Sequence, residues 1–175
     1  ITVAINISGL QIREDAFIDN ISDALTRSGL DPSHLELELT ESILMDDSTL
    51  VIDKVNQLKG LGVHVAIDDF GTGFSSMNYL KRFPITKLKI DNSVISGLPQ
   101  SSEDMAITRA IIAMAHGMNI KVIAEGVEHE DQVDFLRRHE CDVLQGYYYA
   151  KPMPFNEFLQ LKELQQKTNS KLRIV

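Results

Sequence analysis

The chain has 175 residues, 43% hydrophobic and 24% charged, and this composition excludes a disordered or low-complexity segment. Its 25 acidic and 17 basic residues give a formal net charge of −8, which argues against a DNA or RNA polymer as partner. The lone cysteine, Cys141, excludes a disulfide within these residues. No apolar run approaches the roughly 18 residues of a membrane span, and there is no signal peptide. We therefore expect a cytoplasmic protein, or the cytoplasmic part of a membrane-anchored one.

Strand-like and helix-like segments alternate along the chain. Runs of β-branched and apolar residues predict six strands, and apolar residues at helical spacing predict the helices between them. Gly29 ends the first helix, and Ser101 or Ser102 is the expected N-cap of the helix that starts at residue 103. The expected strands cover 3–8, 35–42, 64–70, 86–91, 121–126 and 142–149, and the expected helices include 17–28, 51–58, 103–116, 131–138 and a last one that begins at Pro154.

This alternation predicts repeated βα units and a parallel sheet, either an open doubly wound sheet or a closed barrel. No GxGxxG pattern follows the first strand, which disfavours a dinucleotide-binding open sheet. Polar residues stand at the end of all six strands, and a barrel brings such ends to one rim. We therefore expect an α/β fold, a TIM-like (β/α)8 barrel over residues 1–167. A barrel of this kind has eight strands, and the sequence predicts six of them. Its first strands are expected before Ile1, and residues 168–175 are expected to form a polar tail.

The polar strand ends predict a metal site. Six acidic residues would repel one another strongly on one rim, a repulsion that divalent cations relieve. They are Glu38, Asp68, Asp69, Asp91, Glu125 and Glu128. Oxygen ligands that include an amide suit Mg²⁺ or Mn²⁺, and no histidine pair has the spacing of a zinc site. An adjacent carboxylate pair can bridge two ions, as in-line displacement at phosphorus requires. The polar residues at the strand ends are Asn6, Glu38, Glu41, Asp68, Asp69, Lys89, Asp91, Glu125, Glu128 and Gln145.

Each of these residues taken alone also has a structural interpretation. Glu36 and Glu38 are typical of a solvated strand face, and an Asp-Asp pair more often forms a turn than a metal site. Lys89 lies inside an apolar strand, which favours a functional role because a buried lysine needs a partner. A Schiff-base aldolase that uses Lys89 is a further alternative, but it leaves the acidic residues unexplained. The joint pattern at six successive strand ends therefore favours the metal site.

Six segments, in order, resemble the EAL domain family of bacterial cyclic-di-GMP phosphodiesterases: INISGLQ, ELELTES, AIDDFGTGFSSMNYL, LKIDNS, VIAEGVE and QGYYYAKPMP. The resemblance covers nearly the whole chain, from residue 3 to about residue 161. It implies a TIM-like barrel that uses two Mg²⁺ or Mn²⁺ ions to hydrolyse cyclic-di-GMP to linear pGpG. It further implies a homodimer through residues 92–118 and fusion to upstream sensory or regulatory domains.

The resemblance also implies roles for single residues. Asp68 would lie between the two ions, and Lys89 would hold the attacking water or the scissile phosphate. Glu41 would anchor the loop of residues 69–76. The implied metal ligands are Asn6, Glu38, Asp68, Asp69 and Glu125; the implied catalytic residues are Lys89, Glu125, Asp69 and Gln145; and the implied supporting residues are Glu41, Asp91, Glu128 and Pro152.

One departure from the family pattern leaves a second function open. The Glu-Ala-Leu signature, whose glutamate is a metal ligand in the family, is absent from these 175 residues and is expected in the strands before Ile1. The alternative is a non-catalytic cyclic-di-GMP receptor or a protein-interaction module on the same fold. Such proteins usually lose metal ligands or the DDFGTG loop, whereas this chain keeps both, which favours the enzyme.

Overall fold

A six-stranded parallel sheet forms the centre of the molecule, as described for residues 1–45, 49–73 and 80–168 of a computed structural model. The strands pair in chain order, β1-β2-β3-β4-β5-β6, and every pair is parallel. This confirms the predicted βα alternation. The strands are β1 (Val3–Ile7), β2 (Leu35–Thr40), β3 (His64–Phe70), β4 (Lys87–Ile90), β5 (Lys121–Ala124) and β6 (Val143–Leu144).

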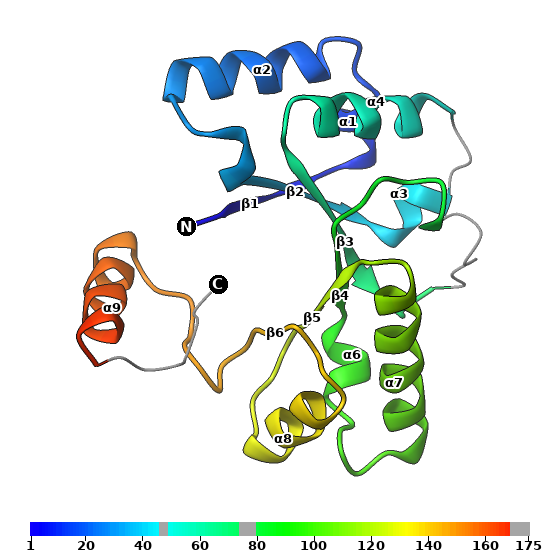
Figure 1. Cartoon of the computed structure of the whole chain (residues 1–175), viewed down its shortest axis with the longest axis vertical. Helices are drawn as coiled ribbons and strands as arrows, with labels where there is room; N and C mark the ends of the chain where they lie inside the picture. The colour runs from blue at the N-terminus through cyan, green and yellow to red at the C-terminus, as the bar shows by residue number, and fades with distance from the viewer. Residues whose placement is uncertain (46–48, 74–79, 169–175) are drawn as a thin grey trace.

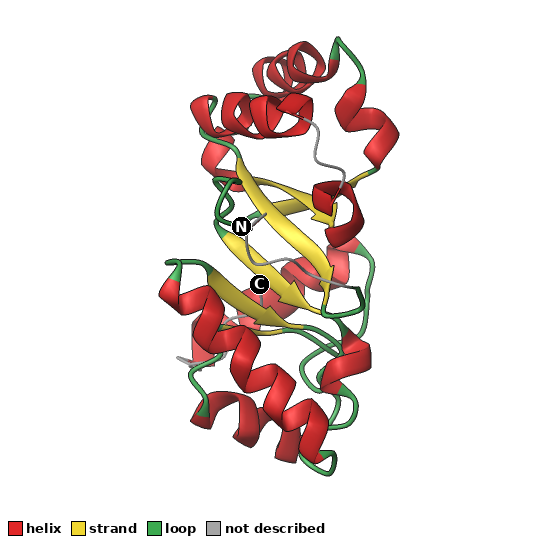
Figure 2. Ribbon diagram, turned by 90° about the vertical axis from the view of Figure 1, so that its right-hand side faces the viewer, coloured by secondary structure: helices red, strands yellow, loops and turns green. Residues whose placement is uncertain are grey.

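Helices flank this sheet in two groups. Figure 1 shows α2 and α4 beside the first strands and α6, α7 and α8 beside the last ones, with α9 set apart from both groups. Figure 2, turned by 90°, shows the twisted sheet running between these groups. The helices are α1 (Gly9–Arg13), α2 (Phe17–Ser28), η1 (Pro32–His34), α3 (Glu41–Met45), α4 (Thr49–Gly60), α6 (Asn92–Ile95), α7 (Ser102–Gly117), α8 (Glu130–Arg138) and α9 (Phe155–Thr168).

Helix boundaries follow the capping signals in the sequence. Ser101 is the N-cap of α7, where its side chain accepts a hydrogen bond from the backbone of Asp104, and Gly29 ends α2 with a left-handed φ of 67°. The short helices α1, α3 and α6 have four or five residues each, too few for a helical period to be visible in the sequence. Among the residues described, no helix is both long and apolar enough to cross a membrane.

The two faces of the sheet differ sharply in chemistry. Alternate residues such as Leu37, Ile67 and Leu88 are fully buried in the hydrophobic core that the sheet shares with the helices. The intervening residues of β2 are Glu36 and Glu38, which are only 3% and 8% exposed. The interpretation of these glutamates as a solvated strand face is therefore wrong. Both faces of β2 are buried, as is usual in parallel sheets, and one of them buries charge.

The last strand is much shorter than the sequence predicts. A strand over 142–149 is wrong beyond Leu144, because the chain turns there and wraps closely around Val127. A Cβ atom at Gly146 would lie 2.2 Å from the Val127 carbonyl oxygen, so only glycine allows this approach. The predicted strand over 35–42 also ends early, since Glu41 begins α3.

The predicted barrel is therefore present in part. Six of the eight strands of a TIM-like barrel are described, and closure by two further strands stays a prediction. The division at residue 167 is likewise a prediction, since α9 extends to Thr168 and the rest of the expected tail lies outside the described residues.

Candidate active site

An irregularity in β3 positions the two adjacent aspartates at the end of this strand. The register between β3 and β4 shifts between Ile67 and Phe70, so Asp68 and Asp69 stand in a β-bulge at the end of β3. Asp69 has a left-handed φ of 56°, which is strained for a residue with a side chain but less so for aspartate. Its N–H donates to Asp68 Oδ1 at 3.1 Å. The bulge leaves Asp68 buried and Asp69 exposed on the same rim.

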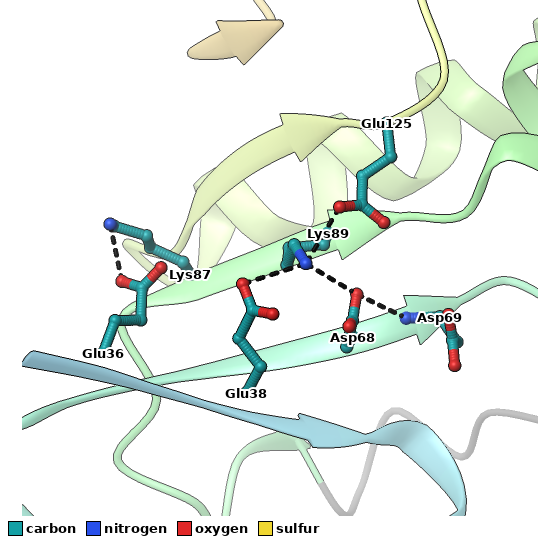
Figure 3. Close-up of polar contacts among 7 residues, drawn as sticks. All are labelled: Glu36, Glu38, Asp68, Asp69, Lys87, Lys89 and Glu125. Atoms are coloured by element: carbon teal, nitrogen blue, oxygen red, sulfur yellow. Dashed lines mark hydrogen bonds and ion pairs between the residues drawn. The ribbon is translucent and has the colours of Figure 1, made fainter. Parts of the chain in front are cut away.

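Lys89 on β4 is the centre of a buried charge cluster. Its Nζ lies 2.9 Å from Glu38 Oε1, 3.0 Å from Asp68 Oδ1 and 2.8 Å from Glu125 Oε1. These carboxylates come from β2, β3 and the end of β5, and Figure 3 shows all three turned toward the lysine. Ala66 pairs with Glu38 and precedes the bulge, so a small side chain on β3 leaves room for Glu38 to reach β4. The structure thus brings together residues separated by up to 87 positions, from Glu38 to Glu125.

The cluster shifts the proton affinities of its members. Burial by itself lowers the pKa of Lys89, but its hydrogen bonds to the three carboxylates outweigh burial and hold that pKa above the ordinary value. Burial raises the pKa of Glu125 even though the bond to Lys89 lowers it. Burial and the neighbouring carboxylates of Asp68 and Asp91 raise the pKa of Asp69. Lys89 therefore stays charged at neutral pH, while Glu125 and Asp69 bind protons more readily than ordinary carboxylates do.

A second lysine lies on the same strand. Lys87 forms an ion pair with Glu36, and both side chains lie in the row next to Lys89 and Glu38 (Figure 3). The strand pattern around Lys89 does not by itself single out Lys87. The available signal is the two-residue repeat in β2 and β4, which places Glu36 with Glu38 and Lys87 with Lys89 on one face.

Three of the other predicted residues are held close to this rim. Asn6 lies on β1 opposite Glu38 in the strand register and is exposed. Glu41 is 7% exposed, and its Oε2 accepts a hydrogen bond from the N–H of Gly71 at 3.2 Å. Asp91 is the N-cap of α6 and accepts a hydrogen bond from the N–H of Ser93 at 2.9 Å. Hydrogen bonding by the Ser93 side chain, and to a lesser extent by its backbone, lowers the pKa of Asp91. Residues 74–76 of the predicted loop lie outside the described residues.

The remaining predicted residues do not join the Lys89 cluster. Glu128 is exposed in the loop before α8, where Gln132 holds its backbone N–H. Gln145 and Pro152 line a hollow of about 630 Å³ that also reaches Lys89 and Glu38. Aromatic residues of the chain after β6 form part of its wall, including Tyr147, Phe155 and Phe158.

The donor set has the chemistry of a site for hard divalent cations. Carboxylate oxygens from three strands converge within 3.0 Å of one ammonium group, and an amide side chain stands beside them on β1. Within the described residues, however, no group of three or more His, Cys, Asp or Glu side chains already has a metal-binding arrangement. The carboxylates are grouped around Lys89 instead.

A parallel sheet of barrel type with an acidic, lysine-centred rim places the protein in the TIM-like class of α/β domains. The family model described as EAL domain matches residues 1–152, and the chain belongs to this family.

Relatives with assigned names share this domain. The chain is 46% identical over 157 residues to the bifunctional diguanylate cyclase/cyclic di-GMP phosphodiesterase MucR of Pseudomonas aeruginosa, covering 90% of this chain and 23% of MucR. It is 44% identical over 161 residues to the cyclic di-GMP phosphodiesterase NbdA of the same organism, covering 90% of this chain and 21% of NbdA. The solved PaMucR phosphodiesterase in complex with c-di-GMP is 45% identical with a TM-score of 0.86, covering 90% of this chain and 64% of that one. The chain thus spans less than a quarter of these two curated relatives.

Proposed function

We propose that this chain belongs to a metal-dependent phosphodiesterase that hydrolyses cyclic-di-GMP to linear pGpG in bacterial signalling. The main support is the charge balance around Lys89, where two buried carboxylates and the half-buried carboxylate of Glu125 meet one ammonium group. Such an excess of buried negative charge is costly unless further cations neutralise it. The names of MucR and NbdA, each at least 44% identical to this chain, support cyclic di-GMP as the substrate.

Two Mg²⁺ or Mn²⁺ ions are the proposed cations. Their ligands would be drawn from Asn6, Glu38, Asp68, Asp69 and Glu125, with the glutamate of a Glu-Ala-Leu segment added where the full-length protein has one. When bound, such ions lower the pKa of a water molecule so that hydroxide is available near neutral pH.

Different residues of this chain would then have different roles in the reaction. Lys89 keeps its charge, which would stabilise the negative charge that develops at the phosphorus centre in the transition state. Glu125 and Asp69 have raised pKa values, and their carboxylates are therefore the proposed acceptors of the proton from water. Gln145 lines the same hollow and would orient the phosphate there.

The hollow beside the cluster supports a substrate with flat rings and negative charge. It combines Lys89 with the aromatic ring of Tyr147, over which Lys151 Nζ stands 5.5 Å from the ring centroid. Its volume of about 630 Å³ lies within the usual range for sites that hold small ligands. Aromatic rings beside cations suit the bases and phosphates of a cyclic dinucleotide.

The test is hydrolysis of cyclic-di-GMP by the full-length protein, with chromatographic detection of pGpG. Activity should disappear after chelation of divalent ions and return with Mg²⁺ or Mn²⁺. Full hydrolysis in excess chelator would refute the metal-dependent mechanism.

A cyclic-di-GMP receptor without hydrolysis is the second candidate. It is favoured by the grouping of the carboxylates around Lys89, since no metal-binding arrangement is preformed among the described residues. Tight binding of cyclic-di-GMP without formation of pGpG at any Mg²⁺ or Mn²⁺ concentration would select this function.

We also propose that structure outside these 175 residues completes the barrel, and that upstream sensory or regulatory domains accompany it. Val3 and Ile5 on β1 remain 46% and 45% exposed, which is unusual for apolar strand residues and supports further packing on β1. The long relatives support additional domains, since the chain spans only 23% of MucR.

A homodimer through residues 92–118 is the proposed assembly. Ile107 on α7 is 37% exposed, whereas Met105 and Met114 are partly buried against the core. The apolar contact in a dimer would therefore centre on Ile107. Light scattering of the full-length protein at high concentration tests this proposal, and a strictly monomeric, fully active protein would contradict it.

A further inference from the structure

A second hollow, which shares no lining residue with the hollow at the Lys89 cluster, lies where one face of α7 meets the end of α8. It has a volume of about 330 Å³, and its lining combines four basic side chains with one acidic one. This ratio is opposite to that of the chain, in which the 25 acidic residues outnumber the 17 lysines and arginines and five histidines together. The lining consists of Arg109, Ile112, Ala113, His116, Arg138, His139 and Glu140.

The α7 side of this hollow follows from helical spacing. Arg109, Ile112, Ala113 and His116 are three, four and seven residues apart, which puts them on one face of the helix. Ile112 is 3% exposed and forms an apolar floor, while Arg109 and His116 are exposed beside it. Arg109 has no hydrogen bond or ion pair with the rest of the described chain.

The other basic groups are fixed by neighbours that lie outside the lining. His116 Nε2 lies 2.9 Å from Asp142 Oδ2, and Asp142 also accepts a hydrogen bond from the N–H of Val122 at 2.8 Å. Asp142 therefore orients the imidazole while it is itself tied to β5. Arg138 Nε donates to the Asp134 carbonyl oxygen at 3.1 Å.

His139 is fixed by an aromatic contact. Its ring packs on Phe135 with 4.6 Å between the ring centroids. His116, Arg138 and His139 are thus held in place before any ligand arrives, and such preorganisation reduces the entropy cost of binding.

We infer that this hollow binds the phosphate group of a small molecule. Two guanidinium groups from different helices can donate paired hydrogen bonds to an oxyanion, which is the preferred arrangement for phosphate. His139 can supply a further donor, whereas His116 Nε2 already pairs with Asp142, and Glu140 is the one acidic group of the lining. A volume of about 330 Å³ is small for a whole dinucleotide, so the ligand is inorganic phosphate or a compact monoester.

The test uses the full-length protein without divalent metal, so that phosphate is not drawn to the Lys89 cluster. Inorganic phosphate is titrated at constant ionic strength, and the histidine ring resonances of His116 and His139 are followed by NMR. We expect saturable shifts of both rings. The same titration with adenosine monophosphate distinguishes the sources, because tighter binding of the nucleotide identifies a monoester site and weaker binding a site for the free ion.

Matched variants decide whether the two arginines make the site. Arg109→Gln and Arg138→Gln should each weaken phosphate binding about tenfold. Arg137→Gln removes the same charge from the adjacent position of α8, where the side chain lies beside Tyr149 and outside the lining, and it should leave binding unchanged. Absence of saturable shifts, or equal weakening by Arg137→Gln, would overturn the inference.

Discussion

The two lysines of β4 have almost the same position in the fold and different surroundings. Lys87 and Lys89 point to the same face of the sheet, and each meets a glutamate from β2. Within the described residues Lys87 has this single ion-pair partner, which gives a balanced pair. Lys89 lies one step closer to the carboxyl end of the strand, where the bulge in β3 and the end of β5 add Asp68 and Glu125. Three carboxylates and one ammonium leave a net charge of −2.

This difference separates structural charge from functional charge. A balanced buried pair is complete in itself, whereas an unbalanced cluster has capacity for added cations and for an anionic substrate bound through them. The position of a lysine along β4 decides whether it forms a balanced ion pair or lies in the unbalanced cluster. In barrels of this class the carboxyl end of the strands is where the chemistry takes place.

The largest difference is expected when each of the two lysines is replaced in turn. Lys89→Met should lower the rate of cyclic-di-GMP hydrolysis by about 10²–10³-fold, because an electrostatic stabiliser of the transition state is lost. Lys87 also lines the hollow, but Lys87→Met should lower the rate per folded molecule far less than Lys89→Met does. It should lower the free energy of unfolding by about 3 kcal/mol, because it leaves Glu36 buried without its partner. Rates at saturating Mn²⁺ and urea unfolding measure the two effects. Equal loss of rate in both variants would contradict the division.

The two glutamates of β2 are expected to differ in the same way in their effect on metal binding. Glu38→Gln should weaken Mn²⁺ binding by about 100-fold or more, because a charged oxygen ligand becomes a neutral amide. Glu36→Gln is the matched control and should bind Mn²⁺ with normal affinity, although its fold is less stable. Calorimetric titration with Mn²⁺ measures both affinities without substrate. Normal Mn²⁺ affinity in Glu38→Gln would exclude Glu38 as a ligand.

Glu41 tests whether the loop after Asp69 is held from outside the cluster. Its carboxylate accepts the N–H of Gly71, and a Cβ atom at Gly73 would lie 3.2 Å from Glu41 Oε1, so the loop passes close to this carboxylate. Glu41→Ala should lower the rate about 10- to 100-fold through weaker metal binding, as loss of such supporting contacts does. The rate is measured against Mg²⁺ concentration. A wild-type rate at limiting Mg²⁺ would exclude the anchoring role.

The smallest effect is expected at Asp91, which caps α6 next to the rim. Asp91→Ala should lower the free energy of unfolding by about 1 kcal/mol through loss of the N-cap, and Asp91→Asn should largely retain it. The bond from Ser93 lowers the pKa of Asp91, so the contribution of its charge is complete above about pH 4 and is lost as the pH falls through the lowered pKa. Urea unfolding at neutral and acidic pH measures this. An Asp91→Ala protein as stable as wild type would show that the cap contributes nothing.

Most of the fold can be predicted from the sequence because its signals are local. Period-two and period-3.6 patterns identify the six strands and the longer helices, and Gly29 and Ser101 mark helix ends through their own backbone and side-chain preferences. The end of β6 cannot be predicted in this way. It depends on contact between Gly146 and Val127, which the sequence separates by 19 positions.

The amino-acid sequence alone shows which polar residues follow the strands, and these residues predict both the chemistry of the rim and the family. The three-dimensional structure was needed to show that Glu36 and Glu38 are buried rather than solvated. It was also needed to show that Lys89 meets three carboxylates while Lys87 meets one. The physical reason is that burial and charge balance depend on neighbouring strands. A strand's own alternation fixes which side chains share a face. The register of β2 against β3, the registers of β3 and β5 against β4, and the bulge at Asp68 fix which charges meet there.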